Sequence, residues 1–123
     1  MRLLLDTHVF LWWRANDDRL TEAARSAVAD AEIVFVSAAT AWEAAIKAAL
    51  GRLRYPDTIE AGVEASGFEK LPITLAHAER AATLPRIHSD PFDRMLVAQA
   101  QSEALALVTS DRLLRRYGVS VLW

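Results

Sequence analysis

Five short, mostly apolar runs are the feature of this sequence that most constrains its fold. They lie at residues 2–5, 33–36, 71–73, 105–108 and 119–122 and are too short to form helices. A run without polar alternation is typical of a strand that is covered on both faces, as in a parallel sheet. The runs therefore predict a mostly parallel sheet of about five short strands.

The segments between these runs have helical spacing. Apolar residues recur every three or four positions in residues 20–31, 41–53 and 91–103, and shorter helical patterns cover 9–13, 58–65, 76–84 and 112–117. Helices that connect parallel strands cover both faces of the sheet. We therefore predict an α/β protein with three layers, helices on either side of the sheet, and a single domain over residues 1–123.

The composition excludes several kinds of protein. The chain of 123 residues is 53% hydrophobic and 24% charged, which is typical of a folded domain and not of a disordered tail. The absence of cysteine excludes a disulfide framework, a thiolate zinc site and a cysteine nucleophile. The formal net charge of −2 gives no strongly basic total, but it does not exclude nucleic acid, because metal ions bound by acids can supply the positive charge. No apolar stretch approaches the ~20 residues of a membrane span, so we expect a cytoplasmic protein.

Acidic residues follow the predicted strands or begin the helices after them. Asp6 comes directly after residues 2–5, and Asp111 follows residues 105–108. Glu43 lies near the start of the helix after residues 33–36, and Asp93 lies in the first turn of the helix at 91–103. The carboxyl ends of parallel strands share one edge of the sheet, where α/β proteins bind ligands. We therefore expect the four carboxylates around one cavity.

Four carboxylates in one cavity require compensation. Two of them about 4 Å apart repel each other by roughly 4 kcal/mol at an effective dielectric constant near 20. Either some are protonated, with a raised pKa, or cations lie among them. Ligand sets made only of oxygen favour Mg²⁺ or Mn²⁺. Such ions can bind a phosphodiester, activate a water molecule and stabilise the leaving oxygen.

Each acid also has a purely structural explanation. Thr40 and Glu43 fit a capping box, and Glu43 is spaced to pair with Lys47 one helical turn later. The stretch 90–93 (DPFD) fits a helix cap, a first-turn proline and a first-turn acid. A cap, or a turn after a strand, also explains Asp111 and Asp6. If these explanations are sufficient, the protein is a non-catalytic α/β binding module.

Four stretches contain these acids or lie beside them, in an ordered series along the chain. They are residues 3–8 (LLLDTH), 37–47 (SAATAWEAAIK), 90–100 (DPFDRMLVAQA) and 107–111 (LVTSD). In this order, and at the ends of strands, they resemble the PIN-domain family, and within it the VapC-type toxins of VapBC toxin–antitoxin pairs. The resemblance covers essentially the whole chain. It implies a metal-dependent ribonuclease that acts as a toxin.

The resemblance also assigns roles to individual residues. The family's acidic positions fall on Asp6, Glu43, Asp93 and Asp111. Asp6 and Asp93 match the positions that hold the metal ion, Mg²⁺ or Mn²⁺, most directly, and Glu43 completes the cluster and positions the attacking water. Asp111 matches a fourth, more variable acid, whereas Asp90 is an extra acid that we assign to helix capping. A homodimer and a VapB-type antitoxin, whose C-terminal segment fills a groove and covers the active site, are implied as well.

Phosphotransfer proteins are an alternative class with acids at the ends of strands. A receiver domain needs an acid pair after the first strand and a lysine after the last, but the two lysines, Lys47 and Lys70, lie elsewhere. A phosphatase with an aspartate nucleophile needs a second acid two residues after the first, where this chain has His8. Capture of a phosphoaspartate would favour either class.

The remaining polar and aromatic candidates have weaker signals. His8, His77 and His88 lack the spacing of a zinc-binding helix, although His8 is close enough to Asp6 to orient it or to contact substrate. No nucleophile motif surrounds the hydroxyl groups next to Asp111, which fit a cap or a phosphate contact. One aromatic residue in the stretch 10–13 is expected in the core and another at an interface. The arginines of residues 112–116 fit either a solvated face or a contact with the RNA backbone.

Overall fold

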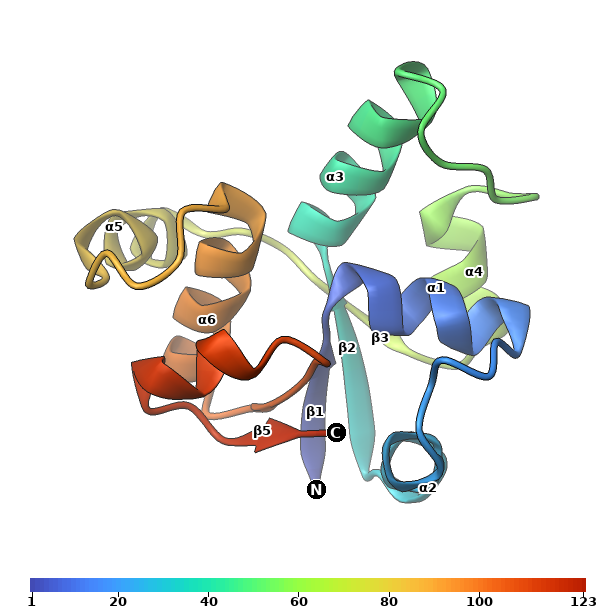
Figure 1. Cartoon of the computed structure of the whole chain (residues 1–123), viewed down its shortest axis with the longest axis horizontal. Helices are drawn as coiled ribbons and strands as arrows, with labels where there is room; N and C mark the ends of the chain where they lie inside the picture. Colours follow the sequence, from blue (N-terminus) through green and yellow to red (C-terminus); the bar gives the residue numbers. More distant parts are fainter.

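The sheet has five strands, all of them parallel, in the order β3-β2-β1-β4-β5 (Figure 1). The computed structural model describes residues 1–123. The strands are β1 (Arg2–Leu5), β2 (Ile33–Ser37), β3 (Glu69–Leu71), β4 (Ala106–Val108) and β5 (Val121–Leu122). The predicted parallel sheet is thus confirmed, but β3 ends at Leu71 instead of beginning there. Proline has no amide hydrogen for a strand ladder, so Pro72 ends the pairing.

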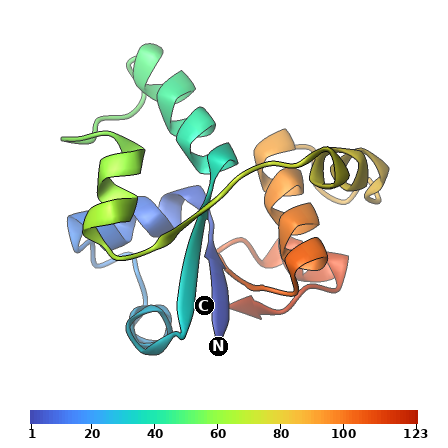
Figure 2. The same cartoon turned by 180° about the vertical axis from the view of Figure 1, so that it is seen from behind.

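Helices cover both faces of this sheet (Figures 1 and 2). They are α1 (Thr7–Ala15), α2 (Glu22–Asp30), α3 (Ala38–Ala49), α4 (Ile59–Ala65), α5 (Leu75–Thr83), α6 (Pro91–Glu103) and the 3₁₀ helix η1 (Arg112–Tyr117). α1, α2 and α4 lie on one side of the strands, and α5, α6 and η1 lie on the other, whereas α3 continues beyond the carboxyl end of β2 and contributes to both cores. The three layers expected from the sequence are therefore present. No helix combines the length and the apolar composition needed to cross a bilayer.

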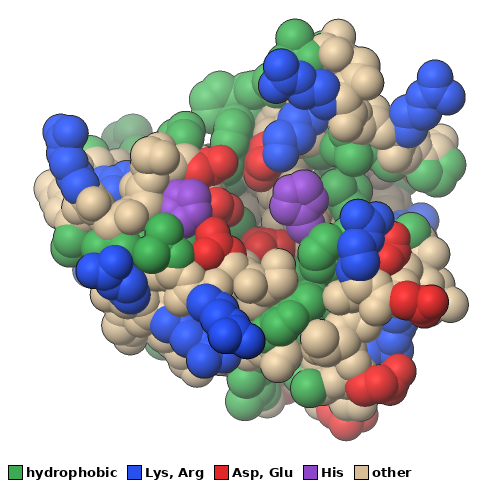
Figure 3. Space-filling view, in the orientation of Figure 1, with side chains coloured by type: hydrophobic (Ala, Val, Ile, Leu, Met, Phe, Trp, Pro, Cys, Tyr) green, Lys and Arg blue, Asp and Glu red, His purple; other side chains and the backbone are tan.

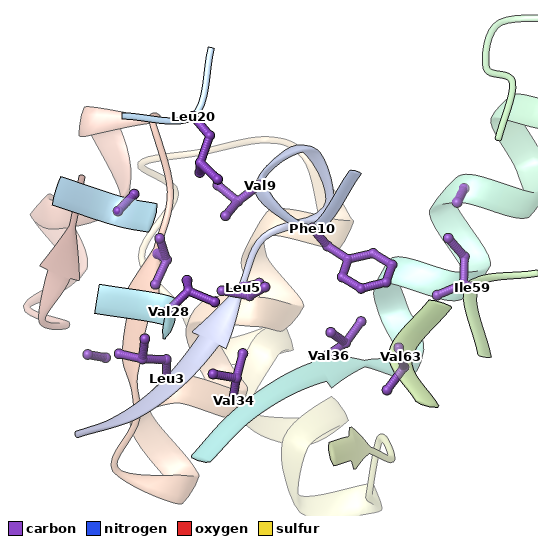
Figure 4. Packing of buried hydrophobic residues seen from close by; sticks show 14 residues of the cluster. Leu3, Leu5, Val9, Phe10, Leu20, Val28, Val34, Val36, Ile59 and Val63 are labelled. Atoms are coloured by element: carbon purple, nitrogen blue, oxygen red, sulfur yellow. The ribbon is translucent and has the colours of Figure 1, made fainter. Parts of the chain in front are cut away.

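Two hydrophobic cores form, one on each face of the sheet. Leu3 and Leu5 point toward α1, α2 and α4 together with Val34 and Val36, as Figure 4 shows. Leu4 points to the opposite face and packs against α6 and η1. Successive residues of a strand face opposite sides, so a strand with both faces buried must be apolar throughout. This explains why residues 3–5 form an unbroken apolar run.

Two helices begin earlier than their sequence patterns predict. The helix expected from Val9 starts at Thr7, because the Asp6 carboxylate accepts a hydrogen bond from the Val9 amide and caps the helix directly after β1. The expected capping box of Thr40 and Glu43 is wrong. Ser37 is the N-cap of α3 and accepts from the Ala39 amide, so both residues lie inside the helix.

The C-terminal end of α6 gives a first testable prediction. Ala104 caps this helix in the left-handed conformation, with φ of 55°, which costs an L-amino acid about 1 kcal/mol and glycine little. We expect Ala104→Gly to raise the free energy of unfolding by roughly 0.5–1 kcal/mol in a urea titration. The exposed Ala45, in the middle of α3, provides the control: Ala45→Gly should lower it by about 1 kcal/mol. A loss of stability in both variants would contradict the prediction.

Candidate active site

The order of the strands reverses at β1, which pairs with β2 on one side and with β4 on the other. Ligands of open α/β sheets bind at such a switch point, outside the carboxyl ends of the strands. Asp6 follows β1 there, Thr109 follows β4, and β2 leads directly into α3, which carries Glu43. Figure 3 shows acidic side chains and two histidines around a hollow on this face of the molecule.

Asp6 lies at the bottom of this site and is only 7% exposed. Its Oδ1 accepts from the Val9 amide at 2.9 Å, and its Oδ2 accepts from the Thr109 hydroxyl. Burial raises the pKa of Asp6, whereas these two hydrogen bonds stabilise its carboxylate form and oppose the increase. The charge of Glu43 raises the pKa further, so the two acids lie close enough to repel each other.

Glu43 is held on both oxygens. The Thr7 hydroxyl donates to Oε1 at 2.7 Å, and Lys47 donates to Oε2 at 2.8 Å from one helical turn further along α3. The pairing of Glu43 with Lys47 expected from the sequence is therefore present. Because Glu43 is buried and Lys47 is partly exposed, the lysine brings compensating charge to the rim of the site.

Asp93 also has a raised pKa. Burial, followed by repulsion from Asp90, Asp6 and Glu43, raises the pKa of Asp93 to about 7, and the nearby His88 opposes the increase. Asp90 itself caps α6 by accepting from the Phe92 and Asp93 amides, as the sequence predicts. The repulsion indicates that α6 places Asp93 among the acids that follow β1 and begin α3.

Asp111 is connected to the other acids of the site through His88. Its Oδ1 accepts from the Leu113 amide and caps η1, as expected. Its Oδ2 lies 2.8 Å from Nε2 of His88, and that nitrogen also lies 3.3 Å from Oδ2 of Asp93. His88 is the site residue that sequence reasoning missed, because it lies in a loop and has no motif spacing that distinguishes it from the other histidines.

The structure thus brings together the side chains of Asp6, Glu43, Asp93 and Asp111. Seven of their eight oxygens have a polar partner within the chain, and the longest of these contacts is the one at 3.3 Å between His88 and Asp93. A donor set made of carboxylate oxygens suits a hard divalent cation. Burial and, to a smaller extent, repulsion between the acids raise the pKa values of Asp6 and Asp93. A divalent cation among these oxygens would favour their charged forms.

Thr109 connects the first and the last of these acids. Its hydroxyl donates to Asp6, and the same oxygen accepts from the Asp111 amide at 3.0 Å. Thr109→Val keeps the shape of the side chain but removes both bonds, and a hydrogen bond to a charged group contributes about 1.5–3 kcal/mol. For Thr109→Val we expect the rate of the ribonuclease reaction that the sequence resemblance implies to fall roughly 10- to 100-fold. Thr109→Ser should keep most of that rate. Equal activity in both variants would contradict this role.

Comparison with known proteins shows the family to which this chain belongs. The PIN domain family matches residues 3–119. The chain belongs to the PIN domain family. A ribonuclease named VapC22, from Mycobacterium tuberculosis, is 34% identical to this PIN domain over 118 residues, which cover 94% of the chain and 91% of the relative.

Solved structures support the same fold for this PIN domain. A crystal structure of VapBC2 from Rickettsia felis, bound to a DNA fragment from its promoter, matches with a TM-score of 0.70 at 11% identity, over 98% of this chain and 97% of the other. FitAcB from Neisseria gonorrhoeae matches with a TM-score of 0.69 at 21% identity, over 98% and 96% of the two chains. Their low identity shows the fold alone.

Aromatic residues surround one side of the PIN domain's acid cluster. Phe10 is the one that enters the core, and Trp12 and Trp13 are half-buried. The exposed His8 stacks on Trp12, with ring centroids 6.0 Å apart, and its charge lowers the pKa of Asp6. Trp123 packs against Trp12 at 5.8 Å. His8 is thus near Asp6, whereas the hydrogen bonds that orient the Asp6 carboxylate come from Val9 and Thr109.

Proposed function

We propose that this PIN domain is a metal-dependent endoribonuclease, the toxin of a toxin–antitoxin pair, which hydrolyses phosphodiester bonds of RNA. The observation that carries the proposal is the convergence of Asp6, Glu43 and Asp93 at the switch point of the sheet, with the pKa of Asp93 raised to about 7. The similarity to a named ribonuclease over 94% of the chain supports the choice of RNA as substrate. We propose the cytoplasm as its location, because the proposed substrate is cellular RNA.

Asp6, Glu43, Asp93 and Asp111 are the residues that we propose hold Mg²⁺ or Mn²⁺. When bound, the ion supplies positive charge for the phosphodiester and lowers the pKa of the attacking water. Asp6 and Asp93 bind it most directly, whereas Glu43, fixed by Thr7 and Lys47, orients the attacking water. Mg²⁺ and Mn²⁺ both bind oxygen ligands. The increase in melting temperature that each ion causes can be compared directly.

Phosphotransfer, the alternative class, has weaker support. A phosphatase with an aspartate nucleophile has a second acid two residues after the first, and the residue at that position after Asp6 is the exposed His8. Lys47 pairs with Glu43, and Lys70 pairs with Glu60 and Glu64 on the surface. Neither lysine is available beside Asp6 to stabilise a phosphoaspartate.

The protein partners that we propose are a VapB-type antitoxin and a second copy of the chain. A cavity of about 510 Å³ lies beside the site. Its lining includes the apolar residues Leu11 and Tyr55 and the basic residues Arg14, Arg19 and Arg54. We propose that the C-terminal segment of the antitoxin fills it. A homodimer is supported by the large apolar side chains exposed on α3 and α5, of which Trp42 is 62% and Leu75 is 83% exposed.

Cleavage assays with purified protein test the proposed function. An RNA pool and single-stranded DNA of the same sequences are incubated with EDTA, Mg²⁺ or Mn²⁺. We expect cleavage of RNA within the chain, only with a divalent cation. Asp93→Asn, purified in the same way, reveals contaminating nuclease, and the exposed Asp30→Asn is the matched charge control. Cleavage in EDTA, equal cleavage by Asp93→Asn, or no cleavage with either metal would contradict the proposal.

A further inference from the structure

The imidazole of His88 lies between two acids of the site. Its Nε2 is 2.8 Å from Oδ2 of Asp111 and 3.3 Å from Oδ2 of Asp93. Each of the three residues offers one potential ligand atom, and these atoms lie within 4.8 Å of one another, as in a small metal site. Whether His88 can serve as a ligand depends on which ring nitrogen carries the proton.

A hydrogen bond from the backbone determines which ring nitrogen of His88 carries the proton. The amide of Asp90 donates a hydrogen bond to Nδ1 of His88 at 3.0 Å. A nitrogen that accepts a hydrogen bond carries no proton, so the ring proton is on Nε2. A protonated nitrogen has no lone pair for a metal ion. In this arrangement Nε2–H donates to Asp111 and lies 3.3 Å from Asp93, and Nε2 is not a ligand.

We propose that His88 is a positioning residue, which holds Asp111 beside Asp93 through its Nε2–H and remains outside the metal's ligand set. The inference rests on the proposed function of the acid cluster. Asp111 needs such a partner because its side chain is 37% exposed and only one of its oxygens is otherwise bonded, to the Leu113 amide. Without His88 between them, the like charges of Asp111 and Asp93 would also repel each other and separate.

His88 is itself held in place by the structure behind it. The Tyr117 hydroxyl accepts from the His88 amide at 2.8 Å and donates to the carbonyl of Pro85 at 3.1 Å. The Arg94 guanidinium donates to the carbonyls of Pro85, Ala81 and Leu84 at 2.9–3.0 Å. The loop between α5 and α6 is thus fixed to both helices and to η1. A rigid support of this kind is what a group needs to orient ligands that bind a metal.

The chain contains a matched control for His88. His77, on α5, also accepts a backbone hydrogen bond on Nδ1, from Thr74 at 3.1 Å, and its Nε2 lies 2.9 Å from a carboxylate oxygen of Glu103. Glu103 is at the end of α6 opposite to Asp93. The two histidines therefore have the same local bonding, but only His88 contacts the acid cluster.

Variants of both histidines test the proposal. In His88→Gln the amide nitrogen can replace the Nε2–H donor, whereas His88→Leu removes it. We expect His88→Leu to weaken Mg²⁺ binding 10- to 100-fold, measured by calorimetry and by the Mg²⁺-dependent shift of the melting temperature, and to lower kcat for RNA by a similar factor with little change in KM. His88→Gln should remain within about threefold of wild type in each measurement. His77→Leu should lower the melting temperature without changing Mg²⁺ affinity.

Nitrogen-15 NMR of histidine-labelled wild-type protein adds a test that needs no substitution and no activity. We expect His88 to keep its proton on Nε2 with and without Mg²⁺. A proton on Nδ1 in the Mg²⁺ form would make Nε2 a ligand and overturn the proposal, even if His88→Leu did not fold. If wild-type protein binds Mg²⁺ and cleaves RNA but His88→Leu equals it in affinity and kcat, the positioning role alone is wrong. If wild-type protein neither binds Mg²⁺ nor cleaves RNA, the proposed function fails, and the inference with it.

Discussion

Asp93→Asn is expected to abolish RNA cleavage and, at the same time, to make the metal-free protein more stable at pH 8. Cleavage should fall roughly 10³-fold or more, as for the loss of a principal electrostatic group of an active site. Stability should rise because burial and three neighbouring acids oppose the charge of Asp93, whereas the amide of asparagine carries none. The charged carboxylate of Asp93 is thus expected to support RNA cleavage and to lower the stability of the metal-free protein.

The pH dependence follows from the same pKa. Asp93 has a pKa of about 7 in the folded protein and an ordinary value of 3.8, so between these values the folded state holds a proton that the unfolded chain has released. The resulting stabilisation is complete below about pH 4, falls as the pH rises and is lost above about pH 7. With an allowance for partial exposure, the contribution is on the order of 2 kcal/mol, or roughly 5–10 °C in melting temperature.

Thermal melts in EDTA at pH 5 and pH 8 check this prediction. Asp93→Asn should melt above wild type at pH 8 and close to it at pH 5. Addition of Mg²⁺ at pH 8 should stabilise wild type and have little effect on the variant, because a bound ligand stabilises only the state that binds it. The exposed Asp30→Asn should follow wild type throughout. A variant that melts below wild type at pH 8 would show that the carboxylate of Asp93 is compensated within the chain.

The largest effect on stability is expected from Phe10→Ala. Phe10 is fully buried and extends from α1 toward Val36, Ile59 and Val63, as Figure 4 shows. Removal of a buried phenylalanine ring costs roughly 3–5 kcal/mol, because apolar burial is lost and a cavity remains. This is a large part of the roughly 5–15 kcal/mol that stabilises a typical domain. We expect the melting temperature to fall by roughly 10–20 °C.

Phe92→Ala provides the comparison for the loss of an aromatic ring. Phe92 is half-buried and packs edge-on against the exposed Trp42, with ring centroids 5.3 Å apart. Its removal should cost less than about 1.5 kcal/mol. Urea titrations of both variants measure the difference. Equal losses would show that Phe10 is less important for the core than its burial indicates.

The strands could be predicted well because burial on both faces leaves a direct trace in the sequence. Leu3, Leu4 and Leu5 are all fully buried, although they point alternately to the two cores. The ends of elements were less predictable. Thr40 and Ser37 are both good capping residues, and the choice of Ser37 depends on β2 passing into α3 without a loop.

The acids of the site were predictable as a group because parallel strands end at one edge of the sheet. Their partners were not. Thr7 and Glu43 are 36 residues apart and meet only because α1 and α3 both begin at that edge. The role of His88 depends on one backbone hydrogen bond, from Asp90, which fixes the ring tautomer. Nothing in the sequence distinguishes that histidine from His77, which has the same local bonding at a different place.

The position of β1 in the middle of the sheet has a consequence for synthesis of the protein. β1 is translated before the other strands, and β4, the strand that pairs with its second side, is translated after β2 and β3. Asp6 and its partner Thr109 are 103 residues apart, and Asp93 and Asp111 also belong to the last third of the chain. A growing chain therefore cannot assemble the acid cluster while most of it is being translated. If the protein cleaves RNA, its active site can form on the ribosome only after Asp93, Thr109 and Asp111 have all been translated.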